Sequence, residues 1–192
     1  MRLLLIRHGR TEANEKHLYC GSTDLELSDA GRDELEKLRS GSSYPDISRM
    51  RILTSGKKRC DETLKLLFGD VPYETDADLS EMDFGVFEMR SYEQMKDDPQ
   101  YIEWISGDNE SNTAPGGESG EIMTARVLRG IGRLMDDGRD ALVVTHGGVI
   151  AAVMAHLFPE ENKNRYEWQP SCGCGYEIDT EKRSYERIPA SH

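Results

Sequence analysis

The apolar residues of the chain first define a set of short strands. Segments 3–6 and 141–145 are unbroken or nearly unbroken apolar runs bounded by charged or turn-forming residues, and 51–54 is a similar shorter run. Runs of this length are too short for helices and are typical of strands buried on both faces of a parallel sheet. Three further segments are strand candidates: 71–75, 176–179 and 185–188.

Apolar residues recur at helical spacing between these strands. One stripe contains Cys60, Leu64, Leu67 and Phe68, with Gly69 following it where a helix would end. A longer stripe predicts a helix over 118–137 that ends at Gly138, and shorter helices are expected over 29–39 and 149–157. Ser28 and Ser55 are candidate N-caps for the helices that follow them.

The remaining segments are predicted to be loops or short helices. Residues 41–46 form a loop, and 106–119 are expected to be a lid or substrate loop. Segment 91–106 is expected to hold short helical pieces interrupted by Pro99, with Trp104 anchoring them to the core. Strands and helices alternate along the chain, which predicts an α/β fold with a mainly parallel sheet, as one domain over residues 1–192.

Charge and composition narrow the possible partners. The 192 residues carry a net charge of −12, which argues against nucleic acid or an anionic membrane as a partner. No apolar run approaches the roughly 20 residues of a membrane span, and the N-terminal run is too short for a signal peptide. We therefore expect a cytoplasmic protein in which clustered arginines serve an anionic ligand.

The four cysteines give no metal-binding pattern. Cys172 and Cys174 are the only close pair, and no second pair stands at zinc-ligand spacing. We expect reduced thiols, no metal and no cofactor. A zinc site built from His8, His146 and this pair is an alternative on ligand types alone, and inhibition by chelators would be its sign.

Arginine and histidine side chains lie at three places near the ends of predicted strands. Arg7, His8 and Gly9 follow the first strand, and His146 with two glycines follows 141–145; Arg59 lies in the first turn of a predicted helix, where a cation opposes the helix dipole. Ligands of open α/β sheets bind beyond the carboxyl ends of the strands. Arginine forks bind phosphate, and an imidazole can attack phosphorus, so the pattern indicates phosphoryl chemistry.

With these residues in view, the chain resembles the histidine phosphatase superfamily, in its phosphoglycerate-mutase-like branch. Six motifs in register over residues 7–148 carry the resemblance: Arg7-His8-Gly9 with Thr11 and Asn14, Cys20-Gly21-Ser22-Thr23-Asp24, Thr54-Ser55 with Arg59 and Thr63, Leu79-Ser80-Glu81 with Gly85 and Glu88, Pro115-Gly116-Gly117-Glu118-Ser119, and Thr145-His146-Gly147-Gly148. The resemblance implies a three-layer fold in which helices flank the central sheet.

The resemblance also implies roles for individual residues. His8 would be the nucleophile that becomes phosphohistidine, and Arg7, Arg59 and His146 would bind the transferring phosphoryl group. Glu81 would protonate the leaving oxygen and later activate water. The remaining expected contacts to substrate or phosphate are Asn14, Cys20, Gly21 and Gly147. Asp83 or Glu88 could share the role of Glu81. A backbone carbonyl on one nitrogen of His8 would fix the reactive tautomer.

These roles describe a metal-independent phosphatase acting on a small phosphorylated metabolite. A phosphoglycerate mutase is the nearest alternative, but residues 90–118 offer only Arg90 and Lys96 as cations, which favours hydrolysis. A non-catalytic phospho-ligand-binding module is a further alternative that the intact set of site residues disfavours. The M-D-F-G-V-F-E stretch resembles that of α-ribazole-5′-phosphate phosphatases within the family.

The chain departs from the family pattern at three cationic positions. Arg10, Lys57 and Lys58 add positive charge near the expected pocket mouth. They indicate either a substrate with a second anionic group or ordinary surface charge.

Overall fold

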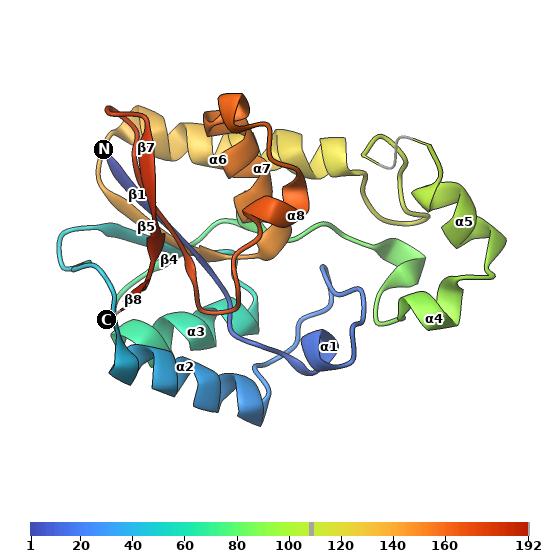
Figure 1. The fold of residues 1–192 in the computed structure, drawn as a ribbon, viewed down its shortest axis with the longest axis horizontal. Helices are drawn as coiled ribbons and strands as arrows, with labels where there is room; N and C mark the ends of the chain where they lie inside the picture. Colours follow the sequence, from blue (N-terminus) through green and yellow to red (C-terminus); the bar gives the residue numbers. More distant parts are fainter. Residues whose placement is uncertain (108–109, 192) are drawn as a thin grey trace.

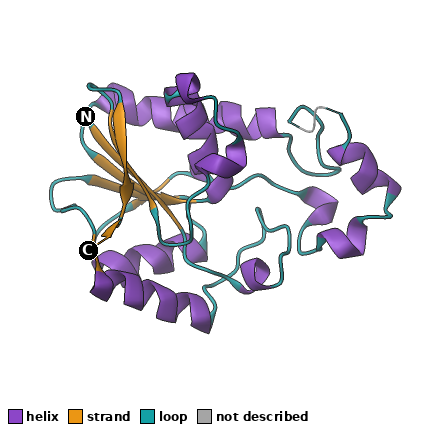
Figure 2. Ribbon diagram, in the orientation of Figure 1, coloured by secondary structure: helices purple, strands orange, loops and turns teal. Residues whose placement is uncertain are grey.

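A central six-stranded sheet organises the molecule, with helices covering both of its faces (Figures 1 and 2). The computed structural model describes residues 1–107 and 110–191. The sheet order is β4-β3-β5-β1-β6-β7; the first four strands are parallel to one another, β6 is antiparallel to β1, and β7 is antiparallel to β6. The predicted three-layer α/β class is therefore confirmed.

The strands are β1 (Arg2–Arg7), β2 (Ser42–Ser43), β3 (Arg51–Thr54), β4 (Glu74–Thr75), β5 (Ala141–Thr145), β6 (Gly175–Asp179), β7 (Ser184–Ile188) and β8 (Ala190–Ser191). The α-helices are α1 (Glu12–Glu15), α2 (Asp29–Gly41), α3 (Lys58–Phe68), α4 (Tyr92–Met95), α5 (Pro99–Ile105), α6 (Gly120–Asp137), α7 (Gly147–Leu157) and α8 (Arg165–Trp168). Short 3₁₀ turns are η1 (Ala77–Leu79), η2 (Gly85–Phe87) and η3 (Pro159–Glu161). Among the helices of these described residues, none is long and apolar enough to cross a membrane.

Alternate residues of β1 enter the two halves of the core. Leu3 and Leu5 belong to the cluster on the side of α6 and α7, whereas Leu4 and Ile6 belong to the cluster on the side of α2 and α3. All four side chains are fully buried. A strand buried on both faces has no polar positions, which is why its sequence is an unbroken apolar run.

Most predicted helix ends are confirmed. Ser28 is the N-cap of α2 and accepts from the backbone N–H of Gly31. Gly69 and Gly138 end α3 and α6 with φ of 84° and 71°, a backbone conformation that suits glycine. Gly132, within α6, has open space where a Cβ would be, with nothing within 4 Å.

Other local predictions are wrong or incomplete. Ser55 does not cap α3, because Lys57 is the N-cap and makes no side-chain capping bond. The predicted short helical pieces over 91–106 are present as α4 and α5, with Pro99 as the first residue of α5. The predicted strand over 71–75 shortens to β4, and the predicted loop over 41–46 contains β2, which pairs with β8.

The expected lid over 106–119 lies partly outside the described residues, which omit 108 and 109. Its later part packs closely on the segment after Glu81. A Cβ on Gly117 would lie 2.3 Å from the carbonyl oxygen of Asp83, and the Val86 N–H donates to the Pro115 carbonyl. This stretch is thus fixed to the loop that precedes η2.

Candidate active site

The carboxyl ends of β3, β5 and β1 meet at one edge of the sheet. In the parallel register Ile6 and Thr54 both lie beside Val144, so the residues after each strand emerge together. These residues include His8, Ser55 and His146, which are all buried. The rings of His8 and His146 are 5.2 Å apart between centroids. The expected convergence of two histidines is therefore present.

His8 is held in one tautomer by its neighbour. Its Nδ1 lies 2.7 Å from the carbonyl oxygen of Gly9, and since a carbonyl only accepts, Nδ1 carries the proton and Nε2 the lone pair. Burial, followed by the positive charges of Arg59 and Arg7, lowers the pKa of His8 to about 3. The absence of a side chain on Gly9 lets this segment pack closely on Leu35, whose Cδ1 would lie 2.6 Å from an added Cβ. His8 is thus an uncharged imidazole with a free nitrogen.

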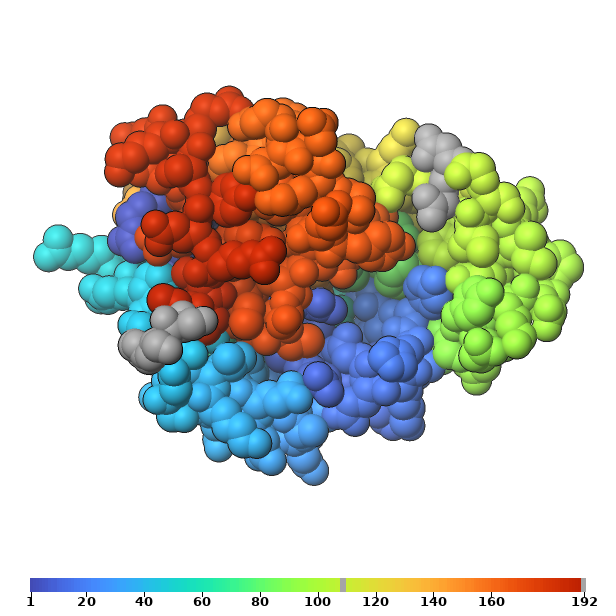
Figure 3. All heavy atoms as spheres, viewed as in Figure 1, coloured from blue at the N-terminus to red at the C-terminus, as the bar shows by residue number. Residues whose placement is uncertain are grey.

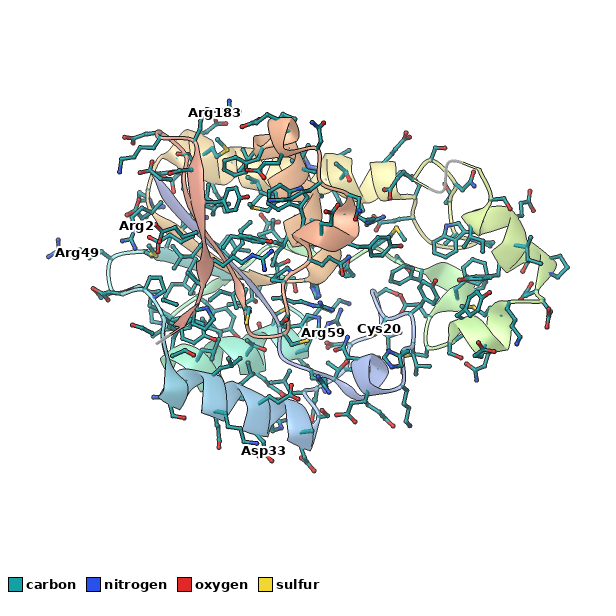
Figure 4. The ribbon with its side chains drawn as sticks, in the orientation of Figure 1. Arg2, Cys20, Asp33, Arg49, Arg59 and Arg183 are labelled. Carbon is teal, nitrogen blue, oxygen red and sulfur yellow. The ribbon has the colours of Figure 1, made fainter. Side chains whose placement is uncertain are left out.

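Arg59 is a buried guanidinium in the first turn of α3. It donates to the carbonyl oxygens of Thr23 and Gly21, each at 2.8 Å, and its Nε donates to His146 Nδ1 at 3.4 Å. Figure 4 labels Arg59, in the first turn of α3, and Cys20, in the loop after α1. Among the described residues these three bonds use three of its five N–H groups, which leaves two for an anionic ligand.

His146 is positioned through both ring nitrogens. Because Nδ1 accepts from Arg59, Nε2 carries the proton and donates to Ser55 Oγ at 2.8 Å. Burial, followed by the charge of Arg59, holds the pKa of His146 well below its usual range, so the ring is neutral. In this state His146 orients Arg59, and its predicted contact with phosphate stays a prediction.

Arg7 presents an unpaired donor to the site. Its Nη1 donates to the carbonyl oxygen of Pro170 at 2.9 Å, whereas its buried Nε has no hydrogen-bond partner in the described part of the chain. A Cβ on Gly147 would lie 3.2 Å from Arg7 Nε and Cζ and 3.1 Å from Gln169. The glycine therefore keeps the space beside this donor open.

Glu81 is anchored at the beginning of α7. Its Oε2 accepts from the backbone N–H of Gly148 at 2.9 Å, and its Oε1 accepts from Met82 N at 3.1 Å. A Cβ on Gly148 would lie 2.4 Å from Oε1, so the absent side chain is what admits the carboxylate.

The carboxylate of Glu88 is hydrogen-bonded to the loop over residues 21–23. It accepts from the backbone N–H groups of Gly21, Ser22, Thr23 and Phe84 and from the Thr23 hydroxyl. Burial alone raises the pKa of Glu88, but these hydrogen bonds outweigh it and lower the value. Asp83 accepts from Ser22 Oγ and Gly85 N. Both carboxylates are occupied by loop contacts, which disfavours the suggestion that they share the role of Glu81.

A cavity of about 460 Å³ lies beside Arg7 and Glu81 (Figure 3), whereas His8, Arg59 and His146 are buried and are not among its lining residues. Arg7, Asn14, Cys20, Glu81 and Gly148 line its polar side. An aromatic wall forms the other side and consists of Tyr19, Phe84, Tyr101 and Trp104. A third side comes from α8 and the residue after it, with Arg165, Tyr166 and Gln169. Sequence reasoning missed Tyr101 and the α8 residues because they reach the cavity only through the tertiary fold.

The other predicted substrate contacts have structural partners. Asn14 Oδ1 accepts from the backbone N and the hydroxyl of Thr11, which orients its amide at the cavity wall. Burial raises the pKa of the Cys20 thiol. Gly21 lets its loop pass the carbonyl oxygen of Met82, which a Cβ would approach to 1.6 Å. Gly21 therefore shapes the loop that Arg59 binds.

The extra cations do not line the cavity. Arg10 pairs with Glu34 at 3.4 Å and Lys58 with Glu26 at 3.1 Å, both at exposed positions. Lys57 Nζ donates to the carbonyl oxygen of Ser22 at 2.5 Å and supports the loop over residues 20–24. These contacts favour surface and loop roles over recognition of a second anionic group.

Neither histidine belongs to a metal cluster in the described residues. No group of three or more His, Cys, Asp or Glu side chains there could hold a metal ion, and the four cysteines are free thiols. The zinc alternative therefore lacks a ligand set within residues 1–107 and 110–191.

Comparison with known proteins identifies the family of the chain. The sequence model of the histidine phosphatase superfamily (branch 1) matches residues 3–189. The chain belongs to this superfamily and is a phosphatase of the histidine phosphatase type.

Individual relatives extend the comparison. The chain is 32% identical over 185 residues to an adenosylcobalamin/alpha-ribazole phosphatase of Salmonella typhimurium, covering 93% of this chain and 90% of the relative. The alpha-ribazole phosphatase of Shigella flexneri has a similar structure, with a TM-score of 0.81 at 30% identity, covering 100% and 96%. A 2,3-bisphosphoglycerate-dependent phosphoglycerate mutase of Cytophaga hutchinsonii is 30% identical over 166 residues, covering 81% and 76%.

Proposed function

We propose that the protein hydrolyses a small phosphomonoester through a phosphohistidine intermediate on His8. The observation that carries the proposal is the hydrogen bond from His8 Nδ1 to the Gly9 carbonyl, because it leaves Nε2 as the free nitrogen. The low pKa of His8 keeps this nitrogen unprotonated at neutral pH. An unprotonated imidazole is a competent nucleophile toward phosphorus.

In the first step, His8 Nε2 forms a bond to phosphorus while the bond from phosphorus to the leaving oxygen breaks. Arg7 and Arg59 bind the phosphoryl oxygens with their remaining N–H groups, and His146 keeps Arg59 oriented. Asn14 and Gly147 complete the phosphate contacts. Protonated Glu81 gives its proton to the leaving oxygen, so the product departs as a neutral alcohol.

In the second step, water attacks the phosphorus of phosphohistidine. Glu81, now a carboxylate, takes a proton from the water, the nitrogen–phosphorus bond breaks, and inorganic phosphate and free His8 are restored. The hydrogen bond from the Gly148 N–H at the beginning of α7 keeps the Glu81 carboxyl group in place between the two steps.

The cavity supports a substrate whose leaving group is aromatic. Tyr19, Phe84, Tyr101 and Trp104 offer ring faces and edges beside the polar end. Relatives that carry the name alpha-ribazole phosphatase share this fold. We therefore take the phosphate ester of alpha-ribazole as the first substrate to test, with adenosylcobalamin-type phosphates as the second.

Hydrolysis is favoured over mutase activity because the two cations of residues 90–107 do not reach the cavity. Arg90 pairs with Asp98 at 3.1 Å and Lys96 with Glu93 at 2.8 Å, and neither lines the cavity. A mutase must hold a second anionic group of its substrate during transfer. Formation of 2-phosphoglycerate from 3-phosphoglycerate with 2,3-bisphosphoglycerate present would point to the mutase.

The test is hydrolysis of p-nitrophenyl phosphate in excess EDTA by wild type, His8→Ala and His156→Ala. His156 is an exposed residue of α7 and serves as the matched control. We expect wild type and the control to be active in EDTA, and His8→Ala to lose activity by at least about 100-fold. Rapid quenching followed by peptide mass analysis should locate an acid-labile phosphoryl group on His8. Full activity of His8→Ala would overturn the proposal.

A further inference from the structure

Arg126 of α6 binds the backbone that carries Glu81. Its guanidinium donates to the carbonyl oxygens of Asp78 at 3.0 Å, Ser80 at 2.6 Å and Glu81 at 2.8 Å. Residues 80–84 form no helix or strand, so their carbonyl groups find partners outside regular structure. The Arg126 side chain therefore holds the backbone of residues 78–81, from which the carboxyl group of Glu81 extends.

Glu118 completes the contact on the other side of Glu81. Its two carboxylate oxygens accept from Arg126 Nε at 2.8 Å and Nη2 at 2.7 Å, and Oε2 also accepts from Asp83 N at 3.1 Å. The backbone N–H of Glu118 donates to the Asp83 carbonyl at 2.8 Å. These contacts use all five N–H groups of the guanidinium and hold residues on both sides of Glu81.

The pair is largely shielded and electrically balanced. The side chains of Arg126 and Glu118 are 15% and 20% exposed. Burial alone raises the pKa of Glu118, but hydrogen bonds from Arg126 and from Asp83 N outweigh it and lower the value. The two opposite charges thus persist together and bring no net charge to the neighbourhood of Glu81.

We propose that Arg126 and Glu118 are positioning residues that set where Glu81 delivers its proton. Neither residue lines the cavity, so both act through the backbone of 78–83. This inference rests on the proposed function, in which Glu81 is the general acid.

A misplaced acid has a distinctive kinetic effect. The p-nitrophenolate ion leaves without a proton, whereas the alkoxide of an alkyl phosphate such as β-glycerophosphate needs one. The ratio kcat/KM reports the steps up to departure of the leaving group and omits hydrolysis of the phosphoenzyme, which both substrates share. Loss of positioning should therefore lower kcat/KM for the alkyl ester selectively.

The experiment compares both substrates in Arg126→Lys and Glu118→Gln, which disrupt the pair from either side. Lysine keeps the charge but lacks the planar fork, and glutamine keeps the size but lacks the charge. Arg129→Met is the matched control, because Arg129 lies on the same helix as Arg126. Its exposed guanidinium binds the side-chain carboxylate of Asp78 and not the backbone near Glu81. Glu81→Gln is the reference for a missing acid.

We expect both pair variants to lose about 10- to 100-fold in kcat/KM on β-glycerophosphate and less than about threefold on p-nitrophenyl phosphate. Arg129→Met should behave as wild type on both. Equal losses on the two substrates in the variants that fold, or no loss, would overturn the inference. If Glu81→Gln itself shows no selective loss, the assignment of Glu81 in the proposed function fails instead.

Discussion

The imidazole of His146 donates to the hydroxyl of Ser55 across 2.8 Å, joining the end of β5 to the end of β3. Ser55 in turn donates to the thiol of Cys60 at 3.3 Å. Together with the bond from Arg59 to His146 Nδ1, these contacts form a directed chain of donors. The orientation of Arg59, the proposed phosphate ligand, therefore depends on Ser55 through His146.

Replacing Ser55 by alanine should impair both folding and catalysis. The buried Nε2–H of His146 would lose its acceptor, which costs about 1–3 kcal/mol of unfolding free energy. A less constrained Arg59 should lower kcat/KM by about tenfold on every phosphate ester. Urea unfolding and steady-state kinetics measure the two effects. Ser40→Ala, at an exposed site on α2, is the control; similar effects in both variants would contradict the prediction.

Acid should destabilise the protein before its carboxylates titrate. The pKa of His8 is about 3 in the folded protein, whereas a histidine outside the fold has a pKa of 6.5. Between these two pH values the unfolded chain therefore binds more protons than the folded protein. Stability is then complete above pH 6.5 and falls as the pH decreases, by up to about 1.4 kcal/mol per pH unit for this group. His146 shifts in the same direction.

Urea unfolding of wild type and His8→Gln between pH 6.5 and about pH 5 measures this loss. Carboxylates contribute little in that window. The dependence of the unfolding free energy on pH should be shallower in His8→Gln, and equal slopes would contradict the pKa shift of His8.

Gly148→Ala should displace the carboxyl group of Glu81, the proposed general acid, and leave the fold unchanged. The new Cβ would meet Glu81 Oε1 at 2.4 Å, and a carboxylate at the end of a flexible side chain can shift. We expect kcat/KM on β-glycerophosphate to fall by about 10- to 100-fold, with p-nitrophenyl phosphate nearly unaffected. Gly132→Ala is the matched control on α6, where nothing lies within 4 Å of the added Cβ. It should leave both activities unchanged and raise the unfolding free energy by about 0.5–1 kcal/mol.

Inorganic phosphate should stabilise the free protein through Arg7. Its buried Nε has no partner in the described residues, and a phosphate oxygen would supply one. At a hundredfold excess over its Kd, phosphate should add about 2.7 kcal/mol to the unfolding free energy. Arg7→Lys should bind phosphate at least about tenfold more weakly and lose about 1.4 kcal/mol of that gain.

Arg2→Lys is the control for this measurement. Arg2 lies at the opposite end of β1, where it pairs with Glu177 (Figure 4). An identical response to phosphate in the two variants would show that the Arg7 guanidinium does not bind the anion.

Local sequence patterns predicted the parts of the fold that depend on local burial. The apolar run of β1 identified a strand buried on both faces, and Gly69 and Gly138 marked helix ends through their backbone conformation. The convergence of His8 and His146 followed from strand ends in a parallel sheet. Each of these inferences needs only residues that are neighbours in sequence and the rule that the carboxyl ends of parallel strands meet at one edge of the sheet.

The failed predictions involve partners that are distant in sequence. Ser55 has a residue type that caps helices, yet its hydroxyl is bonded to His146, 91 residues away. The β2–β8 pair joins Ser42–Ser43 to Ala190–Ser191, and neither segment shows strand periodicity. Tyr101 and Tyr166 reach one cavity from separate helices. Nothing in either local sequence indicates the other, so these contacts required the structure.

Residues after the strand ends form one part of the site, and residues of peripheral helices form another. This separation has a consequence for how substrate preference can change in evolution. His8 and His146 are set by the sheet, whereas the aromatic wall and the α8 side come from segments that contribute no strand to it. If the cavity holds the proposed ester, we expect changes at Tyr101, Trp104 or Tyr166 to alter which ester is accepted more than they alter phosphoryl transfer. Descendants of such a scaffold can acquire new substrates by small steps, each of which retains an active enzyme.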